Sequence, residues 1–374
     1  MTNRSIGETL RVWQNVYRRI RFFRKMYPLS SILKDLFLFP VDYISDERNI
    51  QVVRNLTIAI THRCNIRCQM CYFHQELSNR YVLPFDLYKR VIDAASPRRP
   101  CLILSGGEPF THPDLVEMVA YAKSRYLAVQ IFTNGTLVKP EITDRLVEFG
   151  LDHINFTLLG NEKSHPMVTQ VPRSYEMLVD NLAYFAEHRG NTQVMLNYTI
   201  TPQALDDIDH AVELAKRYKL DGLRFQHYNF LQPEEFEAQG SVMQKLFDQP
   251  AASNEIEDMP KLSEMVSKIT AFMVRLSKEA PNIPVQWAPT LTTAEMVNWY
   301  SSEKFRTQRR CLYPWRGILA DADGKIYPCS KIYLPLGDLH QDDILSIWNS
   351  KDMKKFRKYL RKGLYPACSR CCKL

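Results

Sequence analysis

The sequence predicts an α/β fold, a parallel sheet covered by helices, with a small cysteine-rich module after it. Three observations carry this prediction: a strand–helix alternation over residues 52–228, the short length of that region, and nine cysteines that mostly cluster. Strands alternating with helices at this spacing form a parallel sheet with the helices outside. Because about 175 residues are few for eight strand–helix units, a partial, TIM-like barrel of the (β/α)6 type is expected.

The predicted elements of this barrel follow one another along the chain. Apolar, β-rich runs place the strands at residues 56–60, 101–104, 128–132, 153–158, 193–200 and 223–228. Helical periodicity places the intervening helices at residues 84–95, 113–125, 140–149, 174–188 and 205–218.

Four parts are expected in the whole chain. They are a basic amphipathic N-terminal helical segment, the partial barrel, a polar connector with helices, and the cysteine-rich module, at residues 1–50, 51–230, 231–310 and 311–374. A second short helix in the first part is expected to end before Pro40, because proline disfavours a helix at the residue before it. Asp321 to Gly324 has the composition of a hairpin turn between two short strands.

Charge is concentrated at the two ends of the chain. Residues 1–27 hold seven Lys or Arg against one Glu, and residues 351–374 hold nine against one Asp, whereas the net charge of the whole chain is +8. The middle is therefore acidic, which argues against a general nucleic-acid binder.

The basic N-terminal helix has two interpretations. It packs on the barrel with a solvated arginine face, or residues 4–27 lie on acidic lipid at the inner face of the membrane. The first is slightly favoured, since one amphipathic segment rarely establishes membrane binding. No apolar run in the sequence approaches the roughly 18 residues that cross a bilayer.

The cysteines favour metal or cluster ligation in a reducing, cytoplasmic setting, because an odd number at short spacings does not form a disulfide framework. Cys64, Cys68 and Cys71 lie on a loop directly after the first predicted strand. Three thiolates leave one iron of a 4Fe–4S cube without a protein ligand, and that iron can bind a chelating cofactor. A structural zinc loop is the alternative, with His62 or His74 as the fourth ligand.

A second motif, Ser105-Gly106-Gly107-Glu108-Pro109, follows the next predicted strand. Its glycines permit a close backbone approach, and Glu108 offers a carboxylate. With the preceding cysteine loop, the sequence resembles the radical S-adenosylmethionine (SAM) superfamily over residues 52–228. The resemblance implies that the three cysteines hold a 4Fe–4S cluster, that SAM chelates its open iron, and that Gly106, Gly107 and Glu108 receive the methionine amino group.

Two further segments bear on the SAM site by the same resemblance. Thr133 and Asn134 belong to a segment similar to the family's Thr-Asn-Gly, and Thr157 to one similar to its Ser-Leu-Asp-Gly. Leu159 stands where relatives commonly have the aspartate, so this segment lacks that carboxylate. The family's Arg-Gly pair is absent around residues 168–173, so no partner for the SAM carboxylate is named.

The C-terminal cysteines follow the spacing Cys-x12-Gly-x4-Cys from Cys311 to Cys329, then Cys-x2-Cys-Cys. They resemble the SPASM/twitch module of many radical SAM enzymes. The resemblance implies one auxiliary 4Fe–4S cluster held by Cys311, Cys329, Cys368 and Cys371, with Cys372 a bystander. A zinc ribbon of the same four cysteines is the alternative.

Four other residues have individual predictions. Cys101 lies in an apolar strand and is expected to be a buried hydrophobe. His165, which lacks ligand spacing, is expected on the surface or in a loop. Gln226 and Tyr228, at the end of the last predicted barrel strand, are candidate substrate contacts, or ordinary polar residues at a strand end.

The predicted function is that of a radical SAM oxidoreductase in which the auxiliary cluster accepts an electron from the substrate. No catalytic residue beyond the cofactor ligands is assigned. The resemblance implies a flavodoxin- or ferredoxin-type reductant as partner, and the substrate is a sugar or lipid-linked intermediate or a peptide. The alternative is a non-enzymatic iron–sulfur electron carrier or zinc scaffold, although a carrier has no need of a SAM-binding loop.

Overall fold

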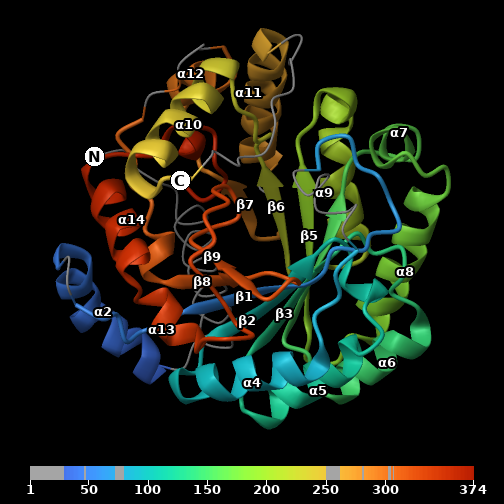
Figure 1. The fold of residues 1–374 in the computed structure, drawn as a ribbon. Helices are drawn as coiled ribbons and strands as arrows, with labels where there is room; N and C mark the ends of the chain where they lie inside the picture. The colour runs from blue at the N-terminus through green and yellow to red at the C-terminus, as the bar shows by residue number, and fades with distance from the viewer. Residues whose placement is uncertain are drawn as a thin grey trace.

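The computed structural model describes residues 29–45, 48–71, 80–249, 262–279, 282–301, 305 and 307–374. In this part of the chain ten strands form one sheet, in the order β10-β9-β8-β1-β2-β3-β4-β5-β6-β7. Helices surround it, as Figure 1 shows. The architecture is the α/β partial barrel that the strand–helix alternation predicts.

Six parallel strands make the centre of the sheet. They are β1 (Asn55–Thr61), β2 (Cys101–Gly106), β3 (Val129–Thr133), β4 (His153–Leu158), β5 (Gln193–Thr199) and β6 (Gly222–Gln226). Each overlaps its predicted run. Because parallel strands end at the same edge, the loops after β1, β2 and β3 come together there.

Five helices connect these strands and lie on the outside of the sheet (Figure 1). Their apolar residues are buried in the core between helices and sheet. They are α4 (Phe85–Ala95), α5 (Leu115–Ser124), α6 (Pro140–Glu148), α8 (Ser174–His188) and α9 (Ile208–Arg217). In α4 the buried residues include Leu87, Val91 and Ile92, which recur at helical spacing.

The sheet extends beyond the six predicted strands on both sides. β7 (Val285–Ala288) pairs in parallel with β6, and β8 (Gly317–Ala320) pairs in parallel with β1. β9 (Lys325–Tyr327) turns back on β8 through the predicted hairpin, and β10 (Gly337–Asp338) pairs with β9. The C-terminal cysteine-rich segment is thereby joined to the barrel by backbone hydrogen bonds.

The other helices lie around this sheet. They are α2 (Leu29–Ile44), the short α7 (Ser164–Thr169), α10 (Pro233–Phe247), α11 (Leu262–Glu279), α12 (Thr293–Ser301), α13 (Ile344–Trp348) and α14 (Lys351–Lys362). No helix among the described residues is long and apolar enough to span a membrane. The basic N-terminal helix expected within residues 4–27 lies outside the described residues.

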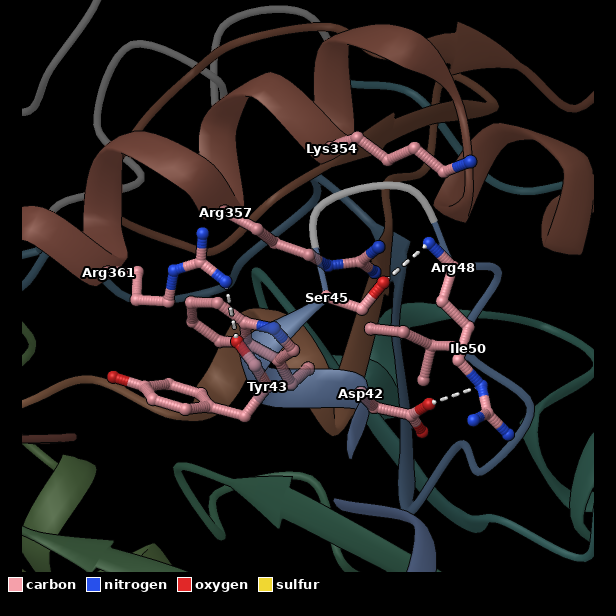
Figure 2. Close-up of a pocket in the computed structure, with 9 residues that line it drawn as sticks. Asp42, Tyr43, Ser45, Arg48, Ile50, Lys354, Arg357 and Arg361 are labelled. Atoms are coloured by element: carbon pink, nitrogen blue, oxygen red, sulfur yellow. Dashed lines mark hydrogen bonds and ion pairs between the residues drawn. The ribbon is translucent and has the colours of Figure 1, made fainter. Parts of the chain in front are cut away.

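Helix α2 continues through Pro40, where the sequence predicts an end. Proline removes one backbone hydrogen bond, but the last turn is held from outside. The ring of Tyr43 packs 4.9 Å from that of Trp315, and the Arg361 guanidinium donates to the carbonyl oxygens of Tyr43 and Ile44. These tertiary contacts, of which Figure 2 shows the one between Arg361 and Tyr43, therefore override the tendency of Pro40 to end the helix.

Candidate functional site

The cysteine loop is held in place by α7 and by a hydrogen bond of its own backbone. The backbone N–H groups of Arg67 and Gln69 donate to the carbonyls of Thr169 and Val168, both at 3.0 Å, so α7 supports the loop. Within the loop the N–H of Cys71 donates to the carbonyl of Cys68 at 3.0 Å. The loop therefore has a defined backbone that presents three cysteines within eight residues.

The three thiols gather at the end of β1 and are partly buried. Cys64 and Cys71 both pack against Ala59. Burial raises the pKa of the Cys64 thiol to about 11 and also raises that of Cys68, so binding a cluster must release protons from these thiols.

The arrangement fits a four-iron cluster better than a single ion. Among the described residues, no group of three or more His, Cys, Asp or Glu side chains is arranged to hold one metal ion. In a 4Fe–4S cube each thiolate binds a different iron, so its ligands stand further apart than around one zinc. His62, one zinc alternative, instead contacts Asp321 through Nε2 at 2.7 Å, and His74 lies outside the described residues.

The glycine motif after β2 packs directly against the cysteine loop. The N–H groups of Gly107 and Glu108 donate to the carbonyls of Thr61 and Arg63, both at 2.8 Å. A Cβ at Gly107 would lie 2.3 Å from the Arg63 carbonyl oxygen, and Gly106 has φ +128°. Only glycine fits both positions, because a side chain would push the two loops apart.

Glu108 lies at the centre of these loops and is 1% exposed. Its carboxylate accepts hydrogen bonds from the Thr133 hydroxyl at 2.7 Å, from the Asn134 N–H at 2.7 Å and from the Phe110 N–H at 3.1 Å. A carboxylate has about four acceptor positions, so capacity for one further donor remains. Burial raises its pKa to about 7, although the three donors act in the opposite direction.

Asn134 connects this carboxylate to the cysteine loop. Its Nδ2 lies 3.0 Å from Asn65 Oδ1 and 4.0 Å from Cys64 Sγ. Asn65 in turn donates to the Thr136 hydroxyl at 2.7 Å. The structure therefore brings together Thr133, Asn134, Glu108 and Cys64 from three loops, as the sequence predicts. Asn65 is a further residue of this site, and its place between two cysteines of the motif is the sequence signal that marks it.

Strand β4 carries Thr157, the remaining residue that the sequence analysis connects with the SAM site. Thr157 lies half-buried on β4, two strands away from β2, which carries the glycine motif. Leu159 is buried, and its N–H donates to Nδ1 of His165 at 3.1 Å. His165 is 1% exposed and lies in α7, so the predicted surface or loop position is wrong: the turn at Gly160 brings the start of α7 close to the end of β4, where the imidazole is buried.

At the end of β6, Tyr228 is 3% exposed and packs beside Phe230, with ring centroids 6.2 Å apart. Gln226 is half-buried. Cys101 is 1% exposed inside β2, which confirms that it is a buried hydrophobe.

The C-terminal cysteines converge although they are distant in sequence. Cys311 lies near Cys329, because besides burial the negative charge of Cys329 raises the pKa of the Cys311 thiol, and Cys368 lies near both, because besides burial the charges of Cys329 and Cys311 raise its pKa. The turn that carries Cys368 is held by α10, where Gln239 accepts from the Ala367 N–H at 3.1 Å. Three of the four predicted auxiliary ligands therefore share one location.

Cys371 and Cys372 are both close to this location. The Cys371 thiol donates a hydrogen bond to the sulfur of Cys372, which lowers the pKa of Cys372 and raises that of Cys371. The negative charge on Cys372 also raises the pKa of Cys311. The assignment of Cys371 as fourth ligand stays a prediction, with Cys372 next to it.

Replacing Glu108 with Gln is expected to weaken SAM binding and to leave both clusters in place. Losing a charge-assisted hydrogen bond should cost roughly 1.5–3 kcal/mol of binding free energy, which is about a 10- to 150-fold higher Kd. Since the pKa of Glu108 is about 7, wild-type affinity should rise about tenfold between about pH 6 and pH 8 as the carboxylate ionises. Equilibrium binding of SAM to the cluster-loaded protein tests both effects. Equal affinities of variant and wild type would show that Glu108 does not face the ammonium group.

Comparison with known proteins agrees with this geometry. Residues 58–215 match the Radical SAM superfamily, and residues 311–372 match an iron–sulfur cluster-binding domain, SPASM. The chain is 28% identical to the AdoMet-dependent heme synthase of Methanosarcina barkeri, over 80% of this chain and 82% of that protein. It is 22% identical to the tungsten-containing aldehyde ferredoxin oxidoreductase cofactor-modifying protein of Pyrococcus furiosus, over 85% and 87% of the two chains.

Solved structures share the fold. Streptococcus suis SuiB matches with a TM-score of 0.60 at 16% identity, over 80% of this chain and 66% of that one. The structure of anSMEcpe with bound AdoMet and Cp18Cys peptide matches with a TM-score of 0.59 at 15% identity, over 86% and 88% of the two chains. The chain therefore belongs to the radical SAM superfamily and carries a C-terminal SPASM iron–sulfur domain.

Proposed function

We propose that the chain is a radical SAM oxidoreductase that removes a hydrogen atom and an electron from an organic cofactor or its precursor. The observation that carries this proposal is the meeting of the cysteine loop, Glu108 and Asn134 at one edge of the sheet. An electron carrier or zinc scaffold requires cysteine ligands but no buried carboxylate held between two loops beside them.

In this proposal the chain's own residues bind and orient. Cys64, Cys68 and Cys71 hold the first 4Fe–4S cluster, and Gly106, Gly107 and Glu108 receive the amino group of SAM. Thr133 and Asn134 keep the Glu108 carboxylate in place. When bound and reduced, the cluster and SAM supply a 5′-deoxyadenosyl radical that takes a hydrogen atom from the substrate.

The C-terminal cysteines support a net oxidation. We assign Cys311, Cys329, Cys368 and Cys371 to an auxiliary 4Fe–4S cluster, which would supply an acceptor for the electron left on the substrate. Lys331 lies close to Cys329, Cys371 and Cys372; burial lowers the pKa of its ammonium group, and the negative charge of these three cysteines acts in the opposite direction. A flavodoxin- or ferredoxin-type protein is the proposed reductant of the first cluster.

The substrate class rests on the relatives that match over most of their length. The printed names of two of them concern heme and a tungsten-enzyme cofactor. An iron porphyrin is therefore the first substrate to assay. A peptide is the second candidate, because solved structures with the same fold hold peptides.

The proposal predicts that the anaerobically reconstituted, reduced protein cleaves SAM to 5′-deoxyadenosine. A substrate that donates the hydrogen should raise the rate at least tenfold, and a deuterated substrate should transfer its label to 5′-deoxyadenosine. Chromatography with mass detection, with an iron porphyrin and a peptide panel as the two arms, measures this. Absence of 5′-deoxyadenosine from protein that holds both clusters would contradict the proposed activity.

A further inference from the structure

Polar side chains line one face of the sheet at β5, β6 and β7, which lie side by side (Figure 1). On β6, Phe225 faces the surrounding helices, since its ring lies 5.0 Å from that of Phe272 on α11. Its register partner Tyr198 on β5 faces the same way, with the two rings 5.9 Å apart. Because side chains alternate along a strand, Asn197 and Arg224 point to the opposite face, toward the interior of the barrel.

Four polar residues share this inner face. Asn197, Arg224 and Gln286 are register partners on three neighbouring strands, and Gln226 follows Arg224 at a spacing of two. We call these four residues the polar row. Asn197 is 6% exposed, and the other three are half-buried. Because neighbouring strands lie about 5 Å apart, one organic molecule can reach several of these side chains.

The polar row has hydrogen-bonding capacity that the protein does not use. In the described part of the chain, none of these four side chains makes a hydrogen bond or an ion pair. Asn197 Oδ1 is buried without a partner, which is costly unless a ligand donates to it. The Arg224 guanidinium offers a planar fork of N–H donors that matches a carboxylate. The row therefore fits a molecule that carries a carboxylate and an N–H or O–H group.

The C-terminal cysteine site adjoins the polar row at Arg224. A hydrogen bond from Cys371 lowers the pKa of Cys372, burial acts in the opposite direction, and the positive charge of Arg224 lowers it further. Lys373 and Lys331 add positive charge at the same cysteine. Two cations of the C-terminal segment itself therefore already accompany these cysteines, whereas Arg224 belongs to a strand of the barrel.

The first cysteine site faces the same interior. Cys64 and Cys71 pack against Ala59 of β1, whereas the residues on either side of Ala59 belong to the core beneath the helices. Thr157 on β4 is the register partner of Asn197, so the inner face continues from the polar row toward β3 and β2. A molecule on the polar row thus lies on the face to which both cysteine sites are turned.

From this placement we infer that the polar row binds the substrate, with Arg224 on a carboxylate and Asn197 accepting from a neighbouring N–H or O–H group. The inference rests on the proposed function and adds that its substrate is an organic acid. The carboxylate belongs to an acidic side chain of a porphyrin or to a peptide, and both sources present the same chemistry to Arg224.

Equilibrium binding of matched ligand pairs to protein that holds both clusters and SAM tests the inference. One arm compares an iron porphyrin that has carboxylate side chains with its methyl ester. The other compares acidic peptides with counterparts in which every carboxylate is replaced by an amide. In one of the two arms, wild-type protein should bind the acid at least tenfold more tightly than the neutral ligand, and that arm identifies the source of the carboxylate.

Arg224→Gln should lower the affinity for the acid at least tenfold and change that for the neutral ligand less than twofold. Arg224→Lys should retain part of the preference, because lysine keeps the charge but not the planar fork. Arg217→Gln is the matched control, since Arg217 is exposed on α9, and its preference should stay within twofold of wild type. Iron analysis and circular dichroism should show the wild-type cluster content and fold in all three variants.

Several results would overturn the inference. They are a wild-type protein without acid preference in either arm, an equal loss of affinity for acid and neutral ligand in Arg224→Gln, and, where that variant does not fold, an unchanged preference in Arg224→Lys. Loss of about four irons from Arg224→Gln but not from Arg224→Lys would overturn it too, since Arg224 would then be a counter-charge of the C-terminal cluster. Protein that forms 5′-deoxyadenosine without acid preference contradicts this inference alone, whereas absence of 5′-deoxyadenosine contradicts the proposed function.

Discussion

Replacing Cys64, Cys68 and Cys71 together with Ala is expected to remove one of two iron–sulfur clusters and all cleavage of SAM. The iron content should fall from about eight to about four per chain, because the C-terminal cysteines keep their own cluster. Iron and sulfide analysis of the anaerobically reconstituted proteins measures the loss, and formation of 5′-deoxyadenosine measures the activity.

Cys101→Ala is the matched control for this variant. Cys101 is buried in β2 and packs as an apolar residue, so its loss should leave the iron content unchanged. An iron content of the triple variant equal to that of wild type would disprove the assignment of the three cysteines.

Replacing Glu235 with Ala is expected to destabilise the protein by about 3–5 kcal/mol, because it leaves a buried arginine without its counter-charge. Nη1 of Arg370 lies 2.6 Å from both carboxylate oxygens of Glu235, and Arg370 is 0% exposed. Since Arg370 stands between Cys368 and Cys371 in the chain, the auxiliary cluster should be lost as well. Denaturant unfolding and iron analysis measure the two effects.

Two further variants test whether the loss of stability in Glu235→Ala comes from the unpaired charge of Arg370 or from any change at this end of α10. Glu234→Ala changes the neighbouring, exposed glutamate and should cost less than about 1 kcal/mol. The double variant Glu235→Leu/Arg370→Met removes both charges and should recover most of the stability, because an apolar pair often replaces a buried ion pair without loss. A double variant as unstable as Glu235→Ala would show that the ion pair itself is not the cause.

The local pattern of apolar residues along the sequence was sufficient to predict the barrel. Each strand from β1 to β6 is a short apolar run bounded by a helix with its own periodicity, so neighbours in sequence are neighbours in the sheet. The meeting of Cys64, Glu108 and Asn134 was predictable for the same reason, because all three follow consecutive parallel strands.

Contacts between distant segments were not predictable in this way. β8 pairs with β1 although the helices and strands of the barrel lie between them in sequence. His62, at the start of the cysteine loop, bonds to Asp321 of the C-terminal hairpin, and no local signal marks either residue as a partner. α7 has only six residues, too few for a helical periodicity to be recognised in the sequence, so the burial of His165 could not be predicted.

The pairing of β8 with β1 has a consequence for synthesis on the ribosome. β1 ends at Thr61 and β8 begins at Gly317, so about 250 residues are translated while that edge of β1 has no neighbour. At about 5–20 residues per second this takes roughly 13–50 s. An unpaired apolar edge is a template for association with other chains. The cysteine loop begins where β1 ends, so the strand that carries the loop is paired on both sides only after β8 has been synthesised. A chain that terminates before β8 leaves this edge of β1 uncovered.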